Sequence, residues 1–211
     1  MTPSPKAEHL SIVVLGQFKP ATVAPAWLER EGLVSKGSAA AAELQLMAPD
    51  VSSFTIASKD VQVLRERLTV STGDAREEDT LSDLIVGILD LSHPPTTKLG
   101  LNYNGRFLLS SESVWHGKGH QLAPKEPWSG LLTKPGLLNV TMRDDCRPNG
   151  HLNVSVGPSP VKNSIVVTTN DHFEIPSGAA RDAIALIKSE WRKSLSNARR
   201  IASILATESP S

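Results

Sequence analysis

The chain contains one short pattern twice, and this repetition constrains its fold more than any other feature. Residues 67–74 read Arg-Leu-Thr-Val-Ser-Thr-Gly-Asp, and residues 164–171 read Ser-Ile-Val-Val-Thr-Thr-Asn-Asp. Two fused copies of one strand-and-helix unit would form a pseudo-symmetric body, a pseudo-dimer within one chain. A Gly-x-Phe followed by a tryptophan lies upstream of each string, at 16–18 with Trp27 and at 105–107 with Trp115.

Composition excludes several classes of protein. The 211 residues include 22 basic and 22 acidic side chains, which argues against a dedicated nucleic-acid or membrane-surface protein. No run of about eighteen apolar residues is present, and the first residues lack the apolar core of a signal peptide. The single cysteine, Cys146, excludes an intrachain disulfide and a cysteine-based zinc cluster. A cytoplasmic protein with no membrane partner is expected.

The first half of the chain predicts strands followed by one helix. Strands are expected at 10–18, 43–47, 53–57 and 61–72, the last as one long strand with a polar face, and 26–31 can form a helical turn. A helix is predicted by apolar residues at helical spacing before Pro94, namely Leu81, Leu84, Ile85, Ile88 and Leu89.

The second half predicts the same order of elements. Strands are expected at 97–110, 137–142, 151–156 and 164–169, with a short helix at 111–122. A long helix at 177–206 is predicted by an apolar stripe of Ile184, Ile187, Trp191, Leu195, Ala198, Ala202 and Leu205.

These elements predict an α+β fold with antiparallel sheets that carry helices on one face. The fold would be built from two β-α-β-β-β-α units. The first unit spans residues 10–95, and the second spans 96–206 and ends in the long helix. Residues 1–9 and 207–211 are expected to be flexible tails.

The segment 115–128 holds the densest cluster of functional residue types. His116 and His120 would share one helix face and could bind a metal, with His172, Asp171 or His151 as a third ligand. The acid of the metalloprotease pattern is missing between the two histidines, and two glycines weaken the helix. No metal site is therefore predicted.

The alternative role of this segment is structural. Trp115 and Trp128 would be largely buried and would anchor the connection between the units, because an indole buries on the order of 200 Å². The histidines would then hydrogen-bond to a neighbouring loop.

Residues 170–172, Asn-Asp-His, are expected to end a strand, where catalytic pairs often lie. An aspartate beside a histidine in sequence cannot easily orient that same histidine. The repeat also places Asp171 in the position of Asp74. Both aspartates are therefore predicted to accept hydrogen bonds from backbone N–H groups in strand-to-helix turns.

No coherent catalytic constellation is present. The sequence has no Gly-rich phosphate loop, nucleophile elbow or paired-carboxylate motif. Cys146 follows two acidic residues, Asp144 and Asp145, and is therefore expected to be a poor nucleophile. No cofactor is expected.

The last predicted helix carries a run of basic side chains. Such a run could contact nucleic acid or an acidic partner, although a solvated outer face is the more common explanation. The basic residues are Lys188, Arg192, Lys193, Arg199 and Arg200.

Several short motifs are distinctive as a set. They are Leu-Gly-Gln-Phe-Lys-Pro at 15–20, Pro-Ala-Trp at 25–27, Leu-Gly-Leu-Asn-Tyr at 99–103, Trp-His and Gly-His within 115–120, Leu-Ala-Pro-Lys-Glu-Pro-Trp at 122–128, and Asn-Asp-His at 170–172. From about Leu10 to Ile187 the chain resembles a sporadically distributed family of uncharacterised bacterial proteins. The resemblance implies a bacterial cytoplasmic protein, and patchy occurrence of this kind is associated with mobile-element or defence loci.

The sequence thus predicts a non-enzymatic interaction or accessory protein that presents a groove or sheet edge to a protein partner. One alternative is an enzyme or metal-binding protein that uses His116, His120 and His172. Another is a nucleic-acid-binding protein that uses the basic helix, and oligomers are compatible with each. The candidate site residues are Trp115, His116, His120, Lys125, Glu126, Trp128, Asp171 and His172.

Overall fold

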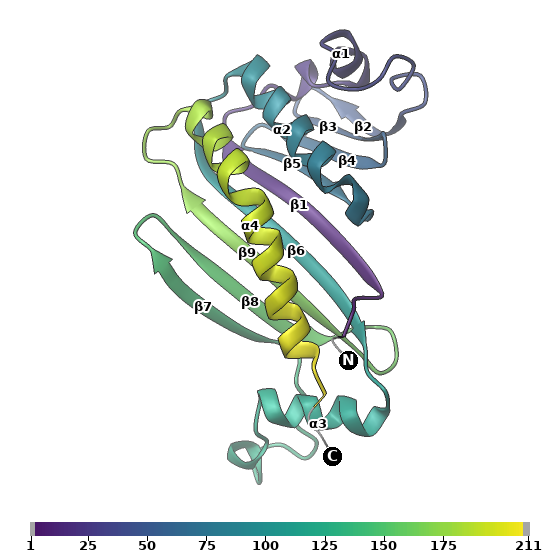
Figure 1. Ribbon diagram of the computed structural model, residues 1–211, viewed down its shortest axis with the longest axis vertical. Helices are drawn as coiled ribbons and strands as arrows, with labels where there is room; N and C mark the ends of the chain where they lie inside the picture. The colour runs from purple at the N-terminus through teal and green to yellow at the C-terminus, as the bar shows by residue number, and fades with distance from the viewer. Residues whose placement is uncertain (1–2, 209–211) are drawn as a thin grey trace.

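A computed structural model describes residues 3–208, which form one nine-stranded antiparallel sheet with helices packed against it (Figure 1). The strand order is β2-β3-β4-β5-β1-β6-β9-β8-β7. The predicted α+β class is confirmed, with a single sheet. The strands are β1 (Ala7–Gly16), β2 (Glu43–Ala48), β3 (Val51–Ile56), β4 (Lys59–Leu64), β5 (Arg67–Thr72), β6 (Thr96–Leu108), β7 (Val140–Arg147), β8 (Gly150–Pro158) and β9 (Ser164–Glu174).

Four α-helices and three short 3-10 turns connect or cover these strands. The longest helix lies across the middle of the sheet in Figure 1. The helices are α1 (Pro25–Arg30), α2 (Glu78–Ser92), α3 (Glu112–Leu122) and α4 (Ala180–Ala206), and the turns are η1 (Pro20–Thr22), η2 (Ala75–Glu77) and η3 (Glu126–Trp128).

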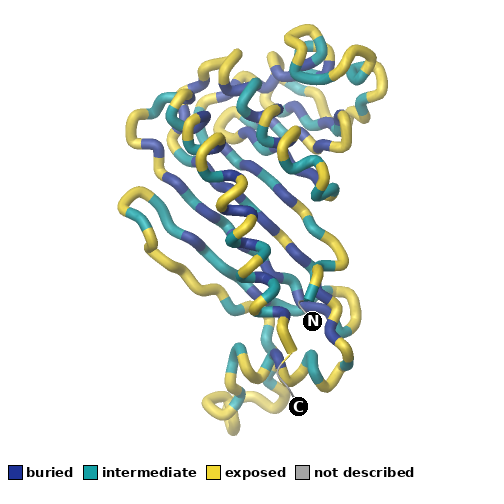
Figure 2. The backbone as a smooth tube through the Cα atoms, in the orientation of Figure 1, coloured by how far each residue is buried: buried dark blue, intermediate teal, exposed yellow. Residues whose placement is uncertain are grey.

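The core lies between the central strands and the helices α2 and α4. Leu10, Ile12 and Val14 of β1 are buried, and the register places them opposite Tyr103, Leu101 and Leu99 of β6. Side chains in a strand alternate between faces, so this pairing forms one continuous apolar face. Figure 2 shows buried residues along the central strands and exposed residues along β7.

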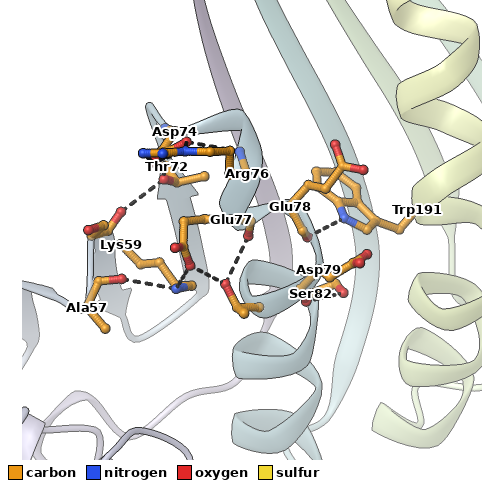
Figure 3. Close-up of polar contacts among 12 residues, drawn as sticks. Ala57, Lys59, Thr72, Asp74, Arg76, Glu77, Glu78, Asp79, Ser82 and Trp191 are labelled. Carbon is orange, nitrogen blue, oxygen red and sulfur yellow. Dashed lines mark hydrogen bonds and ion pairs between the residues drawn. The ribbon is translucent and has the colours of Figure 1, made fainter.

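The predicted apolar stripe of the long helix is confirmed, because every member except Leu205 is buried. The Trp191 indole N–H donates a hydrogen bond of 2.8 Å to the carbonyl oxygen of Glu78, at the start of α2 (Figure 3). Arg192 binds both carboxylate oxygens of Asp79 at 2.9 and 2.7 Å. The helix of the second half is thus fastened to the helix of the first.

The prediction of one long strand at 61–72 is wrong. The chain reverses at residues 65–66, so this stretch forms the hairpin of β4 and β5. Val61 then lies opposite Val70, and Val63 opposite Leu68. In a straight strand, Val61 and Val63 would point to one face, and Leu68 and Val70 to the other. The hairpin instead buries all four side chains on one face. The first half therefore has five strands and the second has four, which departs from the predicted β-α-β-β-β-α order of the first unit.

The predicted tails are too long. Strand β1 begins at Ala7, and the Glu208 carboxylate accepts hydrogen bonds from the Ser110 backbone N–H at 2.8 Å and from its hydroxyl at 2.7 Å. Residues 1–2 and 209–211, which also belong to the predicted tails, lie outside the described residues.

Candidate functional site

A cavity of about 160 Å³ lies between α3 and the ends of β8 and β9. Its apolar lining includes Trp115, Leu122, Leu137, Val156 and Ile165. An engineered apolar cavity of about 150 Å³ in another protein stays dry and binds benzene. The cavity beneath α3 therefore has the size and the lining to hold one aromatic or branched aliphatic group.

Helix α3 is capped by its own N-terminal serine and is held over the cavity by two polar contacts to other elements. The Ser111 hydroxyl caps the helix by accepting from the Val114 backbone N–H at 3.2 Å. The Trp115 indole N–H donates to the Ser164 carbonyl oxygen at 3.1 Å. Lys118 is 7% exposed, and its ammonium donates to the carbonyl oxygen of Thr207 at 2.7 Å. These contacts tie α3 to the start of β9 and to the end of α4.

Burial lowers the pKa of the Lys118 ammonium, because desolvation disfavours its charged form. The unfolded chain therefore binds more protons than the folded chain between this lowered pKa and 10.5, the ordinary pKa of a lysine side chain. Stability rises with pH wherever the unfolded state binds more protons. We expect the unfolding free energy of the wild type to rise across that window relative to Lys118→Met, as measured by urea titrations at several alkaline pH values. Parallel pH profiles would contradict this expectation.

The rim of the cavity is basic. His116, Lys118, His120 and Lys125 line the cavity, and none of the described lining residues is acidic. The Lys118 ammonium already donates to a carbonyl oxygen, and His116 Nε2 lies 3.9 Å from a Glu112 carboxylate oxygen. His120 and Lys125 are therefore the lining side chains best placed to meet a carboxylate of a ligand. The site combines an apolar interior with groups that attract carboxylates.

Four of the predicted site residues therefore meet at one cavity, namely Trp115, His116, His120 and Lys125. Glu126 and Trp128 follow in the turn η3. The prediction that Trp128 is largely buried is wrong, because 49% of it is exposed. Trp115 is partly buried and packs against the core.

The remaining two predicted site residues lie elsewhere, inside β9 and not at its end. His172 stacks on His151 of β8 with ring centroids 4.6 Å apart, and its Nε2 lies 2.9 Å from a Glu174 carboxylate oxygen. Asp171 is buried on the helix-covered face, where its Oδ1 lies 2.8 Å from Arg147 Nη1. No N–H group of the described residues points at that Oδ1 with hydrogen-bond geometry, so the contact with Arg147 is an ion pair without a hydrogen bond.

The predicted equivalence of Asp74 and Asp171 is wrong. Asp74 caps η2 by accepting from the Arg76 backbone N–H at 3.0 Å, as expected of a strand-to-helix turn. The side-chain hydrogen bond from Arg76 lowers the pKa of Asp74 to about 2. Asp171 makes no such turn, because β9 continues to Glu174.

The structure does not bring His172 to the two histidines of α3. Ile165 lines the α3 cavity, and His172 lies seven residues farther along the same strand. At about 3.3 Å per residue, this spacing corresponds to roughly 23 Å. Within residues 3–208, no three histidine, cysteine or acidic side chains are grouped as metal ligands.

The basic residues of α4 are largely occupied by intramolecular partners. Arg192 pairs with Asp79, Lys193 with Glu190, and Arg199 with both Glu8 and Glu78. These carboxylates neutralise three of the five cations that could have contacted nucleic acid. The positive charge available on this helix is therefore smaller than the sequence indicates.

Sequence reasoning missed an exposed apolar segment next to the cavity, which we call the 128–142 segment. It runs from the end of η3 into β7, and five of its large apolar side chains are between 49% and 87% exposed. The available signal was two pairs of adjacent leucines, at 131–132 outside any predicted element and at 137–138 at the start of the predicted strand 137–142. The exposed members are Trp128, Leu131, Leu132, Leu138 and Met142.

Comparisons with protein-family models, with curated proteins and with solved structures find no match. In the described part of the chain, no helix has both the length and the apolar character needed to cross a membrane. The functional argument therefore depends on the site itself.

Proposed function

We propose that this protein is a non-enzymatic interaction or accessory protein of a bacterial system, which binds a protein partner at the α3 cavity. The partner segment would insert one apolar side chain and carry carboxylates beside it. One observation carries the proposal, namely an apolar cavity whose lining, among the described residues, includes basic side chains and no acidic one. The resemblance to a sporadically distributed bacterial family adds a mobile-element or defence setting as a further expectation.

The exposed surface around the cavity supports a macromolecular ligand. The 128–142 segment adds five exposed large apolar side chains, and Leu137 within it lines the cavity. Contiguous exposed apolar surface with a polar rim is typical of protein-interaction sites. Binding energy at such sites is concentrated where an anchor side chain fills a pocket. The cavity supplies that pocket, and the segment supplies the surrounding contact area.

The alternatives have less support. A catalytic or metal centre built on His116, His120 and His172 requires His172 to reach the α3 cavity. His172 lies seven residues along β9 from Ile165 of that cavity, roughly 23 Å at about 3.3 Å per residue. A nucleic-acid site on α4 would have to compete with the carboxylates that already bind Arg192, Lys193 and Arg199.

We also propose that the two halves are diverged copies arranged as an internal pseudo-dimer. Support comes from the sheet order, in which β1 and β6 lie side by side at the centre and each is flanked by the last strand of its own half. Each half then ends in a helix on the same face of the sheet (Figure 1). The two halves differ in that the first has five strands, β1 to β5, and the second has four, β6 to β9.

Binding of a labelled peptide tests the main proposal. The probe has one phenylalanine flanked by glutamates, and the matched control peptide has lysines in their place. We expect the glutamate peptide to bind at least about tenfold more tightly, because the rim attracts carboxylates. Fluorescence polarisation at two salt concentrations measures both affinities. Equal affinities for the two peptides would contradict the proposal.

A matched pair of glycine variants locates the binding. Gly119 lines the cavity and Gly117 does not, while a Cβ added at either position meets no atom within 4 Å. Gly119→Leu is expected to fill the cavity and weaken peptide binding by about tenfold or more, since one large apolar anchor is excluded. Gly117→Leu should bind as the wild type does. Both variants should fold, because leucine favours a helix over glycine.

A further inference from the structure

The two edges of the sheet differ in chemistry. Strand β7 carries four charged residues within its eight positions, at 143, 144, 145 and 147. Strand β2 carries one charged residue, Glu43, and three large apolar residues that are between 42% and 63% exposed, namely Leu44, Leu46 and Met47. Natural proteins protect sheet edges with charge, proline or a covering element. The β2 edge lacks the charge that protects β7.

Strand β2 has a strand neighbour on one side only. It pairs with β3 and stands first in the strand order, so its outer row of N–H and C=O groups has no strand partner within residues 3–208. Such a row is a template on which another extended chain can add by backbone hydrogen bonds.

The faces to which the side chains of β2 point follow an order that is the same from either end of the strand. Leu44 and Met47 lie opposite Phe54 and Ser52, both buried on the helix-covered face. A register shift between Leu44 and Leu46 turns the next residues to the other face, where Leu46 lies opposite Ser53 and the Gln45 amide donates to the Thr55 hydroxyl at 2.8 Å. The residues at both ends of the strand, 43 and 48, also lie on that other face, opposite Thr55 and Val51.

We propose that β2 pairs antiparallel with β2 of a second copy of this chain, joining two sheets across a two-fold axis. Antiparallel partners point to the same face, so a self-pairing strand must have a pattern that is symmetric about its centre. In the register centred between Gln45 and Leu46, Leu44 of each copy lies opposite Met47 of the other. Glu43 then lies opposite Ala48, so no like charges face each other.

This inference is independent of the proposed peptide site. The α3 cavity involves β8 and β9, which lie on the far side of the sheet order from β2. Figure 1 shows α3 and β2 at opposite ends of the molecule. Pairing through β2 therefore leaves both α3 cavities open.

Sedimentation velocity of the full chain across about a hundredfold range of concentration tests the association, because dimers follow mass action. We expect a shift from the 22.6 kDa monomer toward twice that mass. Leu44→Lys should weaken the association by about tenfold or more, since it places an ammonium opposite Met47 of the other copy. Met142→Lys, at the equally exposed opposite edge, should leave it unchanged. A monomer at every concentration, or equal effects of the two variants, would overturn the proposal.

Cross-linking tests the register. In a Cys146→Ser background, Leu44→Cys and Met47→Cys chains are oxidised separately and as a mixture. Directly opposite residues have Cβ atoms about 4.5–5.5 Å apart, close to what a disulfide needs, whereas 44 and 44 of two copies are not opposite. Disulfide-linked dimers should therefore form in the mixture and not in either chain alone. Equal cross-linking in all three samples would reject this register.

Discussion

Replacing Trp191 with alanine is expected to lower the free energy of unfolding by about 3–5 kcal/mol, the range typical of a buried aromatic truncated to alanine. Trp191 is 2% exposed and is one of the largest buried side chains of the core. Its loss also removes the hydrogen bond from the indole to the Glu78 carbonyl oxygen. The substitution thus creates a cavity and removes one of the contacts between α4 and the start of α2, while the ion pairs of Arg192 and Arg199 remain.

Denaturant titrations of two tryptophan variants provide the measurement. Trp128→Ala is the matched control, because this indole is about half exposed and should cost within about 0.5 kcal/mol, as exposed substitutions usually do. The denaturant concentration at the unfolding midpoint should fall for Trp191→Ala and stay near the wild-type value for Trp128→Ala. A Trp191→Ala midpoint as close to the wild-type value as that of Trp128→Ala would mean that the packing of Trp191 contributes little to stability.

Gly16→Ala is expected to destabilise the protein by about 1–3 kcal/mol or more, the usual cost of overpacking. A Cβ at Gly16 would lie 2.2 Å from the carbonyl oxygen of Pro95 and 3.2 Å from the Cα of Thr96. These are backbone atoms, so relief requires the start of β6 to move away from β1. That movement would also stretch the hydrogen bond from the Gln17 N–H to the Pro95 carbonyl oxygen, which is 2.9 Å long.

The control for this prediction is Gly117→Ala. An added Cβ there meets no atom within 4 Å, and the residue lies in the middle of α3. Replacing a helical glycine with alanine stabilises a helix by about 0.5–1 kcal/mol. The melting temperature should therefore fall for Gly16→Ala and rise for Gly117→Ala. A Gly16→Ala protein as stable as the wild type would show that the β1–β6 junction can relax.

Periodicity predicted the helices well because it reflects burial directly. The stripe from Ile184 to Ala202 repeats at helical spacing, and the helix buries those residues. The hairpin at 61–72 was missed, although the signal was present. Val61 and Val63 are odd-numbered, whereas Leu68 and Val70 are even-numbered, and a single strand cannot bury both pairs on one face.

The candidate site was half predictable. Local sequence brought Trp115, His116, His120 and Lys125 into one segment, and that segment lines the cavity. The other side of the cavity comes from Val156 and Ile165, about thirty residues or more away in sequence, and only the sheet register places them there. His172 was considered as a partner of the α3 histidines because the strand was expected to end at 169. Strand β9 continues to Glu174, so His172 lies inside it and far from α3.

The centre of the sheet has a consequence for how the chain unfolds. Strands β1 and β6 belong to different halves, yet they share a ladder from Ala7 to Gly16, and α2 is bound to α4 across the same boundary. Neither half can open without exposing the apolar face of the other, so we expect one cooperative transition and no half-folded intermediate. Two fragments cut in the connection at residues 93–95 should, for the same reason, complement each other and reassemble without a covalent link.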